Sequence, residues 1–158
     1  MEFTGDELAG VVDLFDALTR AELAEALVEL AYKQGDDRDP SSFAEPIDDA
    51  LASYHLVAVP DADPEADGPL LVAGPLAFPA LPEGATDLPH IMTVPERSVA
   101  RADAGRAAAE RFRADAAGAV DDGDAERMRE LLDASYELEA WAPVDLADAR
   151  ERLDGALG

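Results

Sequence analysis

The sequence predicts a mostly α-helical protein with a small β-hairpin, which places it in the α+β class. Apolar residues recur at helical spacing in the first and last thirds of the 158 residues. Two short apolar runs, 56–59 and 70–73, are separated by prolines and a glycine, as in a hairpin. We therefore expect an N-terminal half over residues 1–75, a proline-rich packed strap over 76–97, and a helical region of about three helices over 98–158, with the two halves packed together.

Two amphipathic helices are predicted at the start of the chain. The first is expected over residues 6–18, with Thr4 or Asp6 as its cap. Its apolar stripe consists of Leu8, Val11, Val12, Phe15 and Leu18. The second helix is expected to begin after Thr19, because Thr19 and Glu22 have the spacing of a capping box.

A third helix is expected just before the hairpin. Its apolar side chains repeat at spacings of four, four and three residues: Phe43, Ile47, Leu51 and Tyr54. The regular helix should begin near Pro46, since a missing N–H is tolerated in the first turn. Phe15, Leu27, Ile47 and Leu51 are expected to form the core of this half. Three helices followed by a hairpin resemble winged-helix domains, and the resemblance implies a recognition helix followed by a wing.

The rest of the chain is predicted to be a strap followed by helices. Five prolines prevent a long regular element over the strap, but its apolar side chains, among them Phe78 and Leu81, predict that it packs across both halves. A first helical stripe contains Ala109, Phe112, Ala116 and Val120, and a second contains Met128, Leu131, Leu132, Ser135 and Leu138. Gly123 is expected to end the first of these helices and Asp124 to cap the second, with Asp145 capping a third.

The charge of the chain indicates its environment. Asp and Glu number 36 against 12 Lys and Arg, which gives a formal charge of −24, and only one of the cations is a lysine. Dense carboxylates, scarce lysine and small apolar side chains resemble the proteins of halophilic archaea, where molar salt screens self-repulsion. The chain has no cysteine, no leader-like N-terminus and no apolar run of 18 residues, so we expect a cytoplasmic protein without a disulfide or a membrane-spanning helix.

Motifs for catalysis or metal binding are weak, and we expect no catalytic, cofactor-binding or metal-ligating residues. The acidic stretch "DADPEADG" from Asp61 lacks the glycine and the bidentate glutamate that an EF-hand loop requires at its sixth and twelfth positions. "DDGDAE" at 121–126 has the pattern of a joint between two helices. His55 and His90 have no metal-ligand spacing, and no nucleophile elbow accompanies the formally possible Ser-His-Asp combinations. His55 is expected to be partly buried and His90 to be exposed.

The expected DNA-contacting face is acidic. The outward positions of the third helix are Glu45, Asp48, Asp49 and Ser53, and the hairpin tip carries Asp61, Asp63, Glu65 and Asp67. Because phosphates are bound mainly by Lys and Arg, this face is poorly suited to DNA. Arginines gather instead at the helical third and its entrance: Arg97, Arg101, Arg106, Arg111, Arg113, Arg127 and Arg129. They would either pair with neighbouring carboxylates or meet an anionic partner.

Over its whole length the chain resembles an uncharacterised family of small acidic proteins from halophilic archaea. The segments that carry the resemblance are "LFDALTRAELAEALVELAYKQG", "GPLAFPALPEGATDLPHI" and "LLDASYELEAWAPVDLADARERLD". The resemblance implies no activity, cofactor or site residue. Our hypothesis is a non-enzymatic regulatory or adaptor protein that binds another protein or itself, and the alternative is a winged-helix DNA-binding transcriptional regulator.

Overall fold

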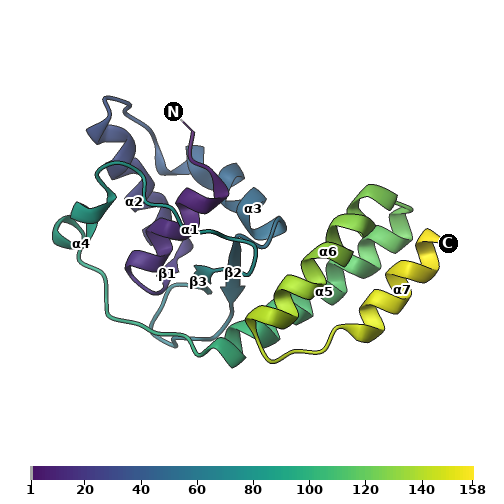
Figure 1. Ribbon diagram of the computed structural model, residues 1–158. Helices are drawn as coiled ribbons and strands as arrows, with labels where there is room; N and C mark the ends of the chain where they lie inside the picture. Colours follow the sequence, from purple (N-terminus) through teal and green to yellow (C-terminus); the bar gives the residue numbers. More distant parts are fainter. Residues whose placement is uncertain (1) are drawn as a thin grey trace. The chain divides into compact units, whose positions relative to one another are not determined.

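A computed structural model describes residues 2–158 of the chain. It is mostly helical with a small three-stranded antiparallel sheet, which confirms the predicted fold class (Figure 1). The elements in chain order are α1 (Gly5–Leu14), β1 (Leu18–Thr19), α2 (Arg20–Lys33), η1 (Pro40–Phe43), α3 (Ala44–Ala52), β2 (Leu56–Val59), β3 (Leu70–Ala73), η2 (Ala85–Asp87), α4 (Leu88–Ile91), α5 (Arg101–Asp122), α6 (Ala125–Trp141) and α7 (Ala147–Leu157). The chain divides into two compact units, an N-terminal unit that ends at Val99 and a C-terminal unit, Ala100–Gly158.

The first two helices have the predicted caps, but the first is shorter than expected. Thr4 and Glu7 form a capping box at the start of α1, and Thr19 and Glu22 form one at the start of α2. The prediction that the first helix reaches residue 18 was wrong. α1 ends at Leu14, and Asp16 takes a left-handed conformation (φ 66°) that turns the chain. Leu18, expected on the helical stripe, instead lies in strand β1.

Strand β1 converts the predicted hairpin into a three-stranded sheet. The strand order is β1-β3-β2, and both neighbouring pairs are antiparallel. Leu18 is opposite Leu71, and Val59 is opposite Leu70, so β3 is the central strand. The two predicted strands have the predicted bounds.

The third helix begins two residues before the predicted start. A 3-10 turn over Pro40–Phe43 leads into α3, so Pro46 is the third residue of the regular helix, still within the first turn, where the missing N–H is tolerated. The helix ends at Ala52. Tyr54, expected on the same stripe, follows in a left-handed conformation (φ 62°), and its side chain is buried.

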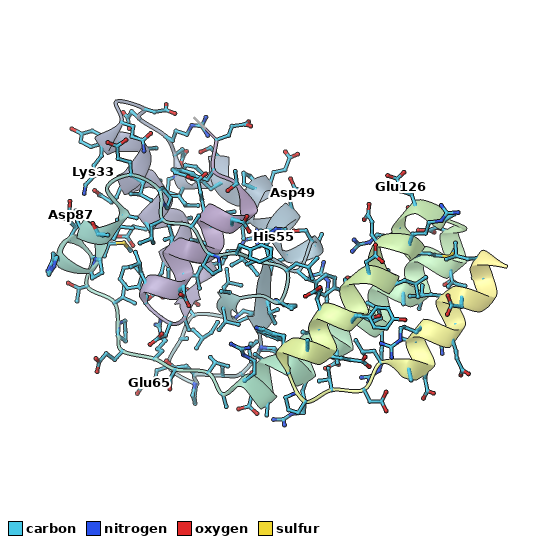
Figure 2. All side chains as sticks on the ribbon, viewed as in Figure 1. Lys33, Asp49, His55, Glu65, Asp87 and Glu126 are labelled. Atoms are coloured by element: carbon cyan, nitrogen blue, oxygen red, sulfur yellow. The ribbon has the colours of Figure 1, made fainter. Side chains whose placement is uncertain are left out.

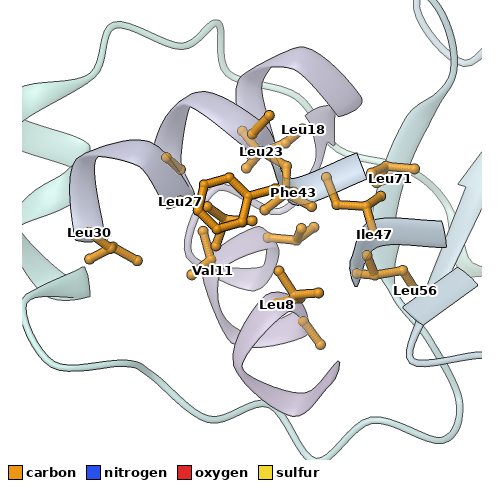
Figure 3. Close-up of a cluster of buried hydrophobic side chains, with 14 of the residues drawn as sticks. Leu8, Val11, Leu18, Leu23, Leu27, Leu30, Phe43, Ile47, Leu56 and Leu71 are labelled. Atoms are coloured by element: carbon orange, nitrogen blue, oxygen red, sulfur yellow. The ribbon is translucent and has the colours of Figure 1, made fainter. Parts of the chain in front are cut away.

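The core of the N-terminal unit joins its helices, its sheet and the strap. The side chains labelled in Figure 3 are those from the helices and the sheet. Leu27 and Ile47 are buried there as predicted, whereas Phe15 and Leu51 are only partly buried at its edge. Fully or almost fully buried members include Leu8, Val11, Leu18, Leu23, Leu27, Leu30, Phe43, Ile47, Leu56 and Leu71. These side chains come from α1, β1, α2, η1, α3, β2 and β3, so one apolar cluster holds all these elements in place.

The strap packs onto this core. After β3 it crosses α1 and then reaches α4 (Figure 1). The crossing is close, because a Cβ atom on Gly10 of α1 would lie 2.1 Å from the carbonyl oxygen of Ala80. Farther along, Ala85, Leu88 and Met92 belong to the apolar cluster of the N-terminal unit.

The C-terminal unit contains three helices, α5, α6 and α7, each of which packs on the other two. Gly123 adopts a left-handed conformation after α5, and the Asp124 side chain accepts a hydrogen bond from the backbone N–H of Arg127, as predicted for a stop and a cap. Asp145 accepts one from the N–H of Ala147, the first residue of α7. The buried side chains of this unit include Phe112, Met128, Leu131, Leu138, Leu146 and Leu153.

Candidate functional site

The exposed face of α3 and the tip between β2 and β3 are strongly acidic. Glu45, Asp48 and Asp49 are exposed on α3, opposite the buried Ile47 and Ala50. Asp61, Glu65 and Asp67 are exposed at the tip, and Asp63 is partly buried. The N-terminal unit as a whole holds twenty-one acidic residues against four cationic ones, a formal charge of −17.

Each of the four cations in the N-terminal unit is paired with a carboxylate of the same unit. Arg20 Nη2 lies 2.7 Å from Asp48 Oδ1, and Lys33 Nζ lies 3.4 Å from Asp87 Oδ2. The side chains of Lys33 and Asp87 can be found in Figure 2. The remaining pairs are Arg38 with Asp36, at 3.0 Å, and Arg97 with both Glu22 and Asp63. These positive charges are therefore already neutralised within the fold.

The most buried of these pairs is centred on Arg97. The Arg97 side chain is only 8% exposed, and its Nη1 and Nη2 lie 2.5 and 3.2 Å from the two carboxylate oxygens of Glu22. Its Nε lies 3.3 Å from Asp63 Oδ2 at the hairpin tip. Burial alone would raise the pKa of Glu22, but the hydrogen bonds from Arg97 and from the N–H of Thr19 outweigh it, so this pKa lies below its ordinary value. Arg97, one of the arginines considered for an anionic partner, is thus an internal anchor.

The hairpin tip is organised as an acidic turn. The Asp63 carboxylate accepts a hydrogen bond from the backbone N–H of Glu65, and the Asp63 carbonyl accepts one from Ala66. Asp61 and Gly68 both have positive φ angles, 57° and 103°. The turn therefore uses the Asp63 side chain to stabilise its own backbone and to bind Arg97. Among residues 2–158, no group of three or more His, Asp or Glu side chains is placed to hold a metal ion.

His55 links the end of α3 to the start of α1. Its Nδ1 lies 2.7 Å from Ser53 Oγ, and its Nε2 lies 3.6 Å from Asp6 Oδ1. The structure thus brings a serine, a histidine and an aspartate together, which the sequence did not predict for these three residues. Ser53 Oγ also donates to the carbonyl of Ala50, and Asp6 Oδ1 accepts the N–H of Phe78. Because the Ser53 hydroxyl donates its single hydrogen to the Ala50 carbonyl, it can only accept a hydrogen bond from the His55 ring. These contacts therefore hold His55 in place and do not activate Ser53 as a nucleophile.

A cleft of about 520 Å³ opens beside this histidine, between the start of the chain and α3. Phe3 and Phe43 contribute aromatic rings whose centroids lie 5.9 Å apart, and the Arg38 guanidinium carbon lies 5.6 Å from the Phe43 ring centroid. Asp49 and His55, whose side chains are labelled in Figure 2, also line the cleft. Its carboxylates outnumber the one guanidinium, which is itself paired with Asp36, so an anionic ligand would meet net repulsion here.

Arginines of the C-terminal unit are also largely engaged within the fold. Arg106 pairs with Asp103, and Arg111 and Arg127 both pair with Asp115. Arg101 donates to the carbonyl of Trp141 and lies over its ring, and Arg113 donates to the carbonyl of Asp145. Arg129 is exposed. These contacts favour internal pairing, one of the two alternatives that the sequence left open.

Two other features of the structure were not predicted from the sequence. Arg150 pairs with Glu139 at 2.7 Å and lies over the Tyr136 ring, and that pair lowers the pKa of the Glu139 carboxyl. Exposed apolar side chains mark the strap, where Phe78 is 83% and Leu81 50% exposed. The strap was expected to bury its apolar residues, so the exposure of these two is a correction. The sequence does not distinguish these two exposed residues from the buried residues of the strap, because both groups are apolar.

Comparison with known proteins adds a family and no activity. The sequence model described as "Family of unknown function (DUF7109)" matches residues 6–158. No curated protein and no solved structure matches the chain. Within residues 2–158, none of the helices has both the length and the apolar character needed to cross a membrane.

Proposed function

Because the chain belongs to DUF7109, a family of unknown function, we propose a role from its own residues: a non-enzymatic regulatory or adaptor protein that acts through protein–protein contacts in a high-salt cytoplasm. The N-terminal unit provides the contact surface. The alternative role, a winged-helix DNA-binding regulator, requires cations that bind phosphates, whereas the Lys and Arg side chains of this unit are paired with its own carboxylates.

We propose that the N-terminal unit is a winged-helix domain. The order α1-β1-α2-α3-β2-β3, with a sheet order of β1-β3-β2, supports this assignment. In such a domain α3 is the recognition helix and the β2–β3 tip is the wing. A fold does not determine a function, however, so the choice between DNA and protein depends on the side chains that these elements present.

One observation favours a protein partner over DNA: all four Lys and Arg side chains of the N-terminal unit are paired with carboxylates of the same unit. In a complex with DNA, phosphates would compete with these carboxylates for the cations, and the exposed carboxylates on α3 would approach phosphates. Molar salt screens that repulsion, but screening supplies no attraction. The exposed Phe78 and Leu81 side chains, in contrast, offer apolar area for a protein contact, and this contact does not weaken as salt rises.

The high-salt environment is proposed from the composition. A formal charge of −24 with a single lysine is typical of surfaces that work in molar salt. Self-repulsion in the N-terminal unit, at −17, is reduced when the Debye length falls to about 3 Å at 1 M salt.

The DNA alternative is tested by fluorescence anisotropy with a pool of promoter-derived duplexes in molar KCl. We expect no site-selective binding, because a sub-micromolar complex needs about 8 kcal/mol of favourable free energy and each Lys and Arg of the N-terminal unit is already paired with a carboxylate. The Asp48→Asn, Asp49→Asn variant should behave like the wild type. Site-selective binding that is lost on substitution of α3 residues would overturn the proposal and favour the DNA-binding regulator.

The protein-binding role is tested by co-purification from the native cells in molar KCl, followed by mass spectrometry. Partners retained by the wild type should be lost from the Phe78→Ser, Leu81→Ser variant. The matched control is Tyr32→Ser, since Tyr32 is also an exposed aromatic residue of this unit, 68% accessible, but lies on α2. Equal retention by all three proteins would count against the strap as the contact surface.

A further inference from the structure

The four residues Phe78–Leu81, here called the hook, form an exposed apolar segment that is held firmly in place. All four residues are exposed. The backbone N–H of Phe78 donates to Asp6 Oδ1 at 2.9 Å, and the N–H of Ala80 donates to the Asp6 carbonyl at 3.0 Å. A rigid backbone that presents an exposed aromatic ring loses little conformational entropy on binding, which favours a docking role.

The surroundings of the hook are acidic. Asp6 lies directly beneath it, and Ala80 packs on Gly10, which is four residues farther along α1. Because Asp13 follows Gly10 by three residues, it lies on the same side of the helix, and it is exposed. A surface that receives the hook should therefore be apolar at its centre and positively charged at its rim.

Three of the cavities lined by the described residues can be compared with that requirement. The cleft beside α3 has Glu2, Glu45 and Asp49 against Arg38 on its walls, and a groove of about 350 Å³ beside the end of α1 has Asp16 and Glu96 against Arg97. Both arginines are paired with carboxylates of the N-terminal unit. Both are acidic surfaces, and both would repel the carboxylates around the hook. The third cavity, between α5 and α7 of the C-terminal unit, carries two arginines.

This third cavity, here called the socket, has a volume of about 210 Å³. Its floor is made of the buried side chains of Ala116 and Ala149, and its rim consists of the exposed Arg113, Arg152 and Asp148. Two guanidinium groups against one carboxylate give the rim a positive charge, and the hydrogen bond from Arg113 to the carbonyl of Asp145 leaves that charge in place, because a carbonyl is neutral. Small floor residues leave room for a large ring, and a guanidinium attracts the face of an aromatic ring.

We propose that the hook of one molecule docks into the socket of a second copy of this chain, with the Phe78 ring over the two alanines and between the two arginines. The inference rests on the proposed function, because it names a partner for the same exposed segment. Each molecule carries one hook and one socket, so the contact joins different surfaces of the two copies. One ring buries far less than the roughly 800 Å² per partner of a stable interface, so the association should be weak and concentration-dependent.

Sedimentation velocity of the purified protein in molar KCl tests the proposal over a range of protein concentrations. The wild type should shift from monomer to dimer or larger species as concentration rises. Phe78→Ser and Arg152→Glu should each stay monomeric at concentrations where the wild type associates. Their matched controls, Tyr32→Ser and Arg129→Glu, make the same chemical change at exposed positions outside the hook and the socket and should associate like the wild type.

A mixing experiment identifies the two surfaces as partners. Phe78→Ser keeps an intact socket and Arg152→Glu keeps an intact hook, so an equimolar mixture should form a one-to-one complex that neither variant forms alone. A wild type that remains monomeric, or a mixture that fails to associate, would overturn the proposal. A monomeric protein that still retains other proteins through Phe78 and Leu81 would remove only this inference, whereas site-selective DNA binding would remove the proposed function itself.

Discussion

Arg97 connects three segments that are distant in the sequence. Its guanidinium bridges Glu22, a member of the α2 capping box, and Asp63 at the hairpin tip, while its own backbone is the end of the strap. The pair with Glu22 is mostly buried, and hydrogen bonding to Glu22 raises the pKa of Arg97 above its ordinary value. Removing one member of such a pair leaves the other charged group without its partner in a poorly solvated place.

The Arg97→Met variant should therefore unfold more easily. We expect a loss of about 2–4 kcal/mol in the free energy of unfolding, since Glu22 and Asp63 would lose their shared cation. Urea denaturation in molar KCl, followed by circular dichroism, measures this quantity. Arg129→Met is the control, because Arg129 is exposed and its loss should change stability by no more than about 0.5 kcal/mol. Equal stability of the two variants would show that the Arg97 bridge contributes nothing in solution.

At the scale of the elements, two glycines within α5 have opposite roles. Gly105 faces the segment after α6, and a Cβ atom there would lie 2.5 Å from the Cβ of Ala142. Gly118 is exposed, and apart from its chain neighbours and the backbone of its own helix, no described heavy atom lies within 4 Å of its ideal Cβ position. Both glycines weaken a helix in principle, but only Gly105 is required for a close approach.

Alanine substitutions should separate the two positions. Gly118→Ala should raise the free energy of unfolding by about 0.5–1 kcal/mol, because alanine is the better helix former and nothing obstructs its methyl group. Gly105→Ala should lower stability, because its methyl group overlaps that of Ala142 and the contact must widen. Thermal unfolding of both variants and of the wild type checks the signs. A gain at both positions would mean that α5 and the segment after α6 are not tightly packed at Gly105.

At the scale of the whole molecule, charge is distributed unevenly. The N-terminal unit has a formal charge of −17 and the C-terminal unit −7, with fifteen acidic residues against eight arginines. Repulsion among carboxylates opposes the compact state, and salt screens it. Stability should therefore depend on ionic strength throughout the chain and most strongly in the N-terminal unit.

The melting temperature should rise strongly between low and molar KCl. A charge-reduced variant, Glu25→Gln with Asp49→Asn and Asp61→Asn, should melt above the wild type at low salt, and the difference should shrink in molar KCl. These three positions are exposed, and asparagine tolerates the left-handed conformation found at Asp61. Differential scanning calorimetry provides the measurement. A melting temperature that stays flat across this salt range would contradict the proposed high-salt adaptation.

Several local features could be read correctly from the sequence. The capping box of Thr19 and Glu22, the stop at Gly123 and the cap at Asp124 all lie where the pattern places them. The bounds of β2 and β3 are also as predicted. Each of these features depends on hydrogen bonds or side-chain periodicity within a few neighbouring residues, so a short window of sequence contains the information. The acidity of the α3 face follows in the same way from helical spacing around Ile47.

The sequence by itself thus determined the class of fold, several helix caps and stops, and the sign of the surface charge, whereas the tertiary structure decided which residues meet. Leu18 becomes a strand only because β3, some fifty residues later, pairs with it. Arg97 is an anchor because Glu22 and Asp63 converge on it, and Phe78 is exposed because Asp6 holds its backbone on the outside of α1. Contacts of this kind depend on packing between distant segments, and local propensity carries no information about that packing.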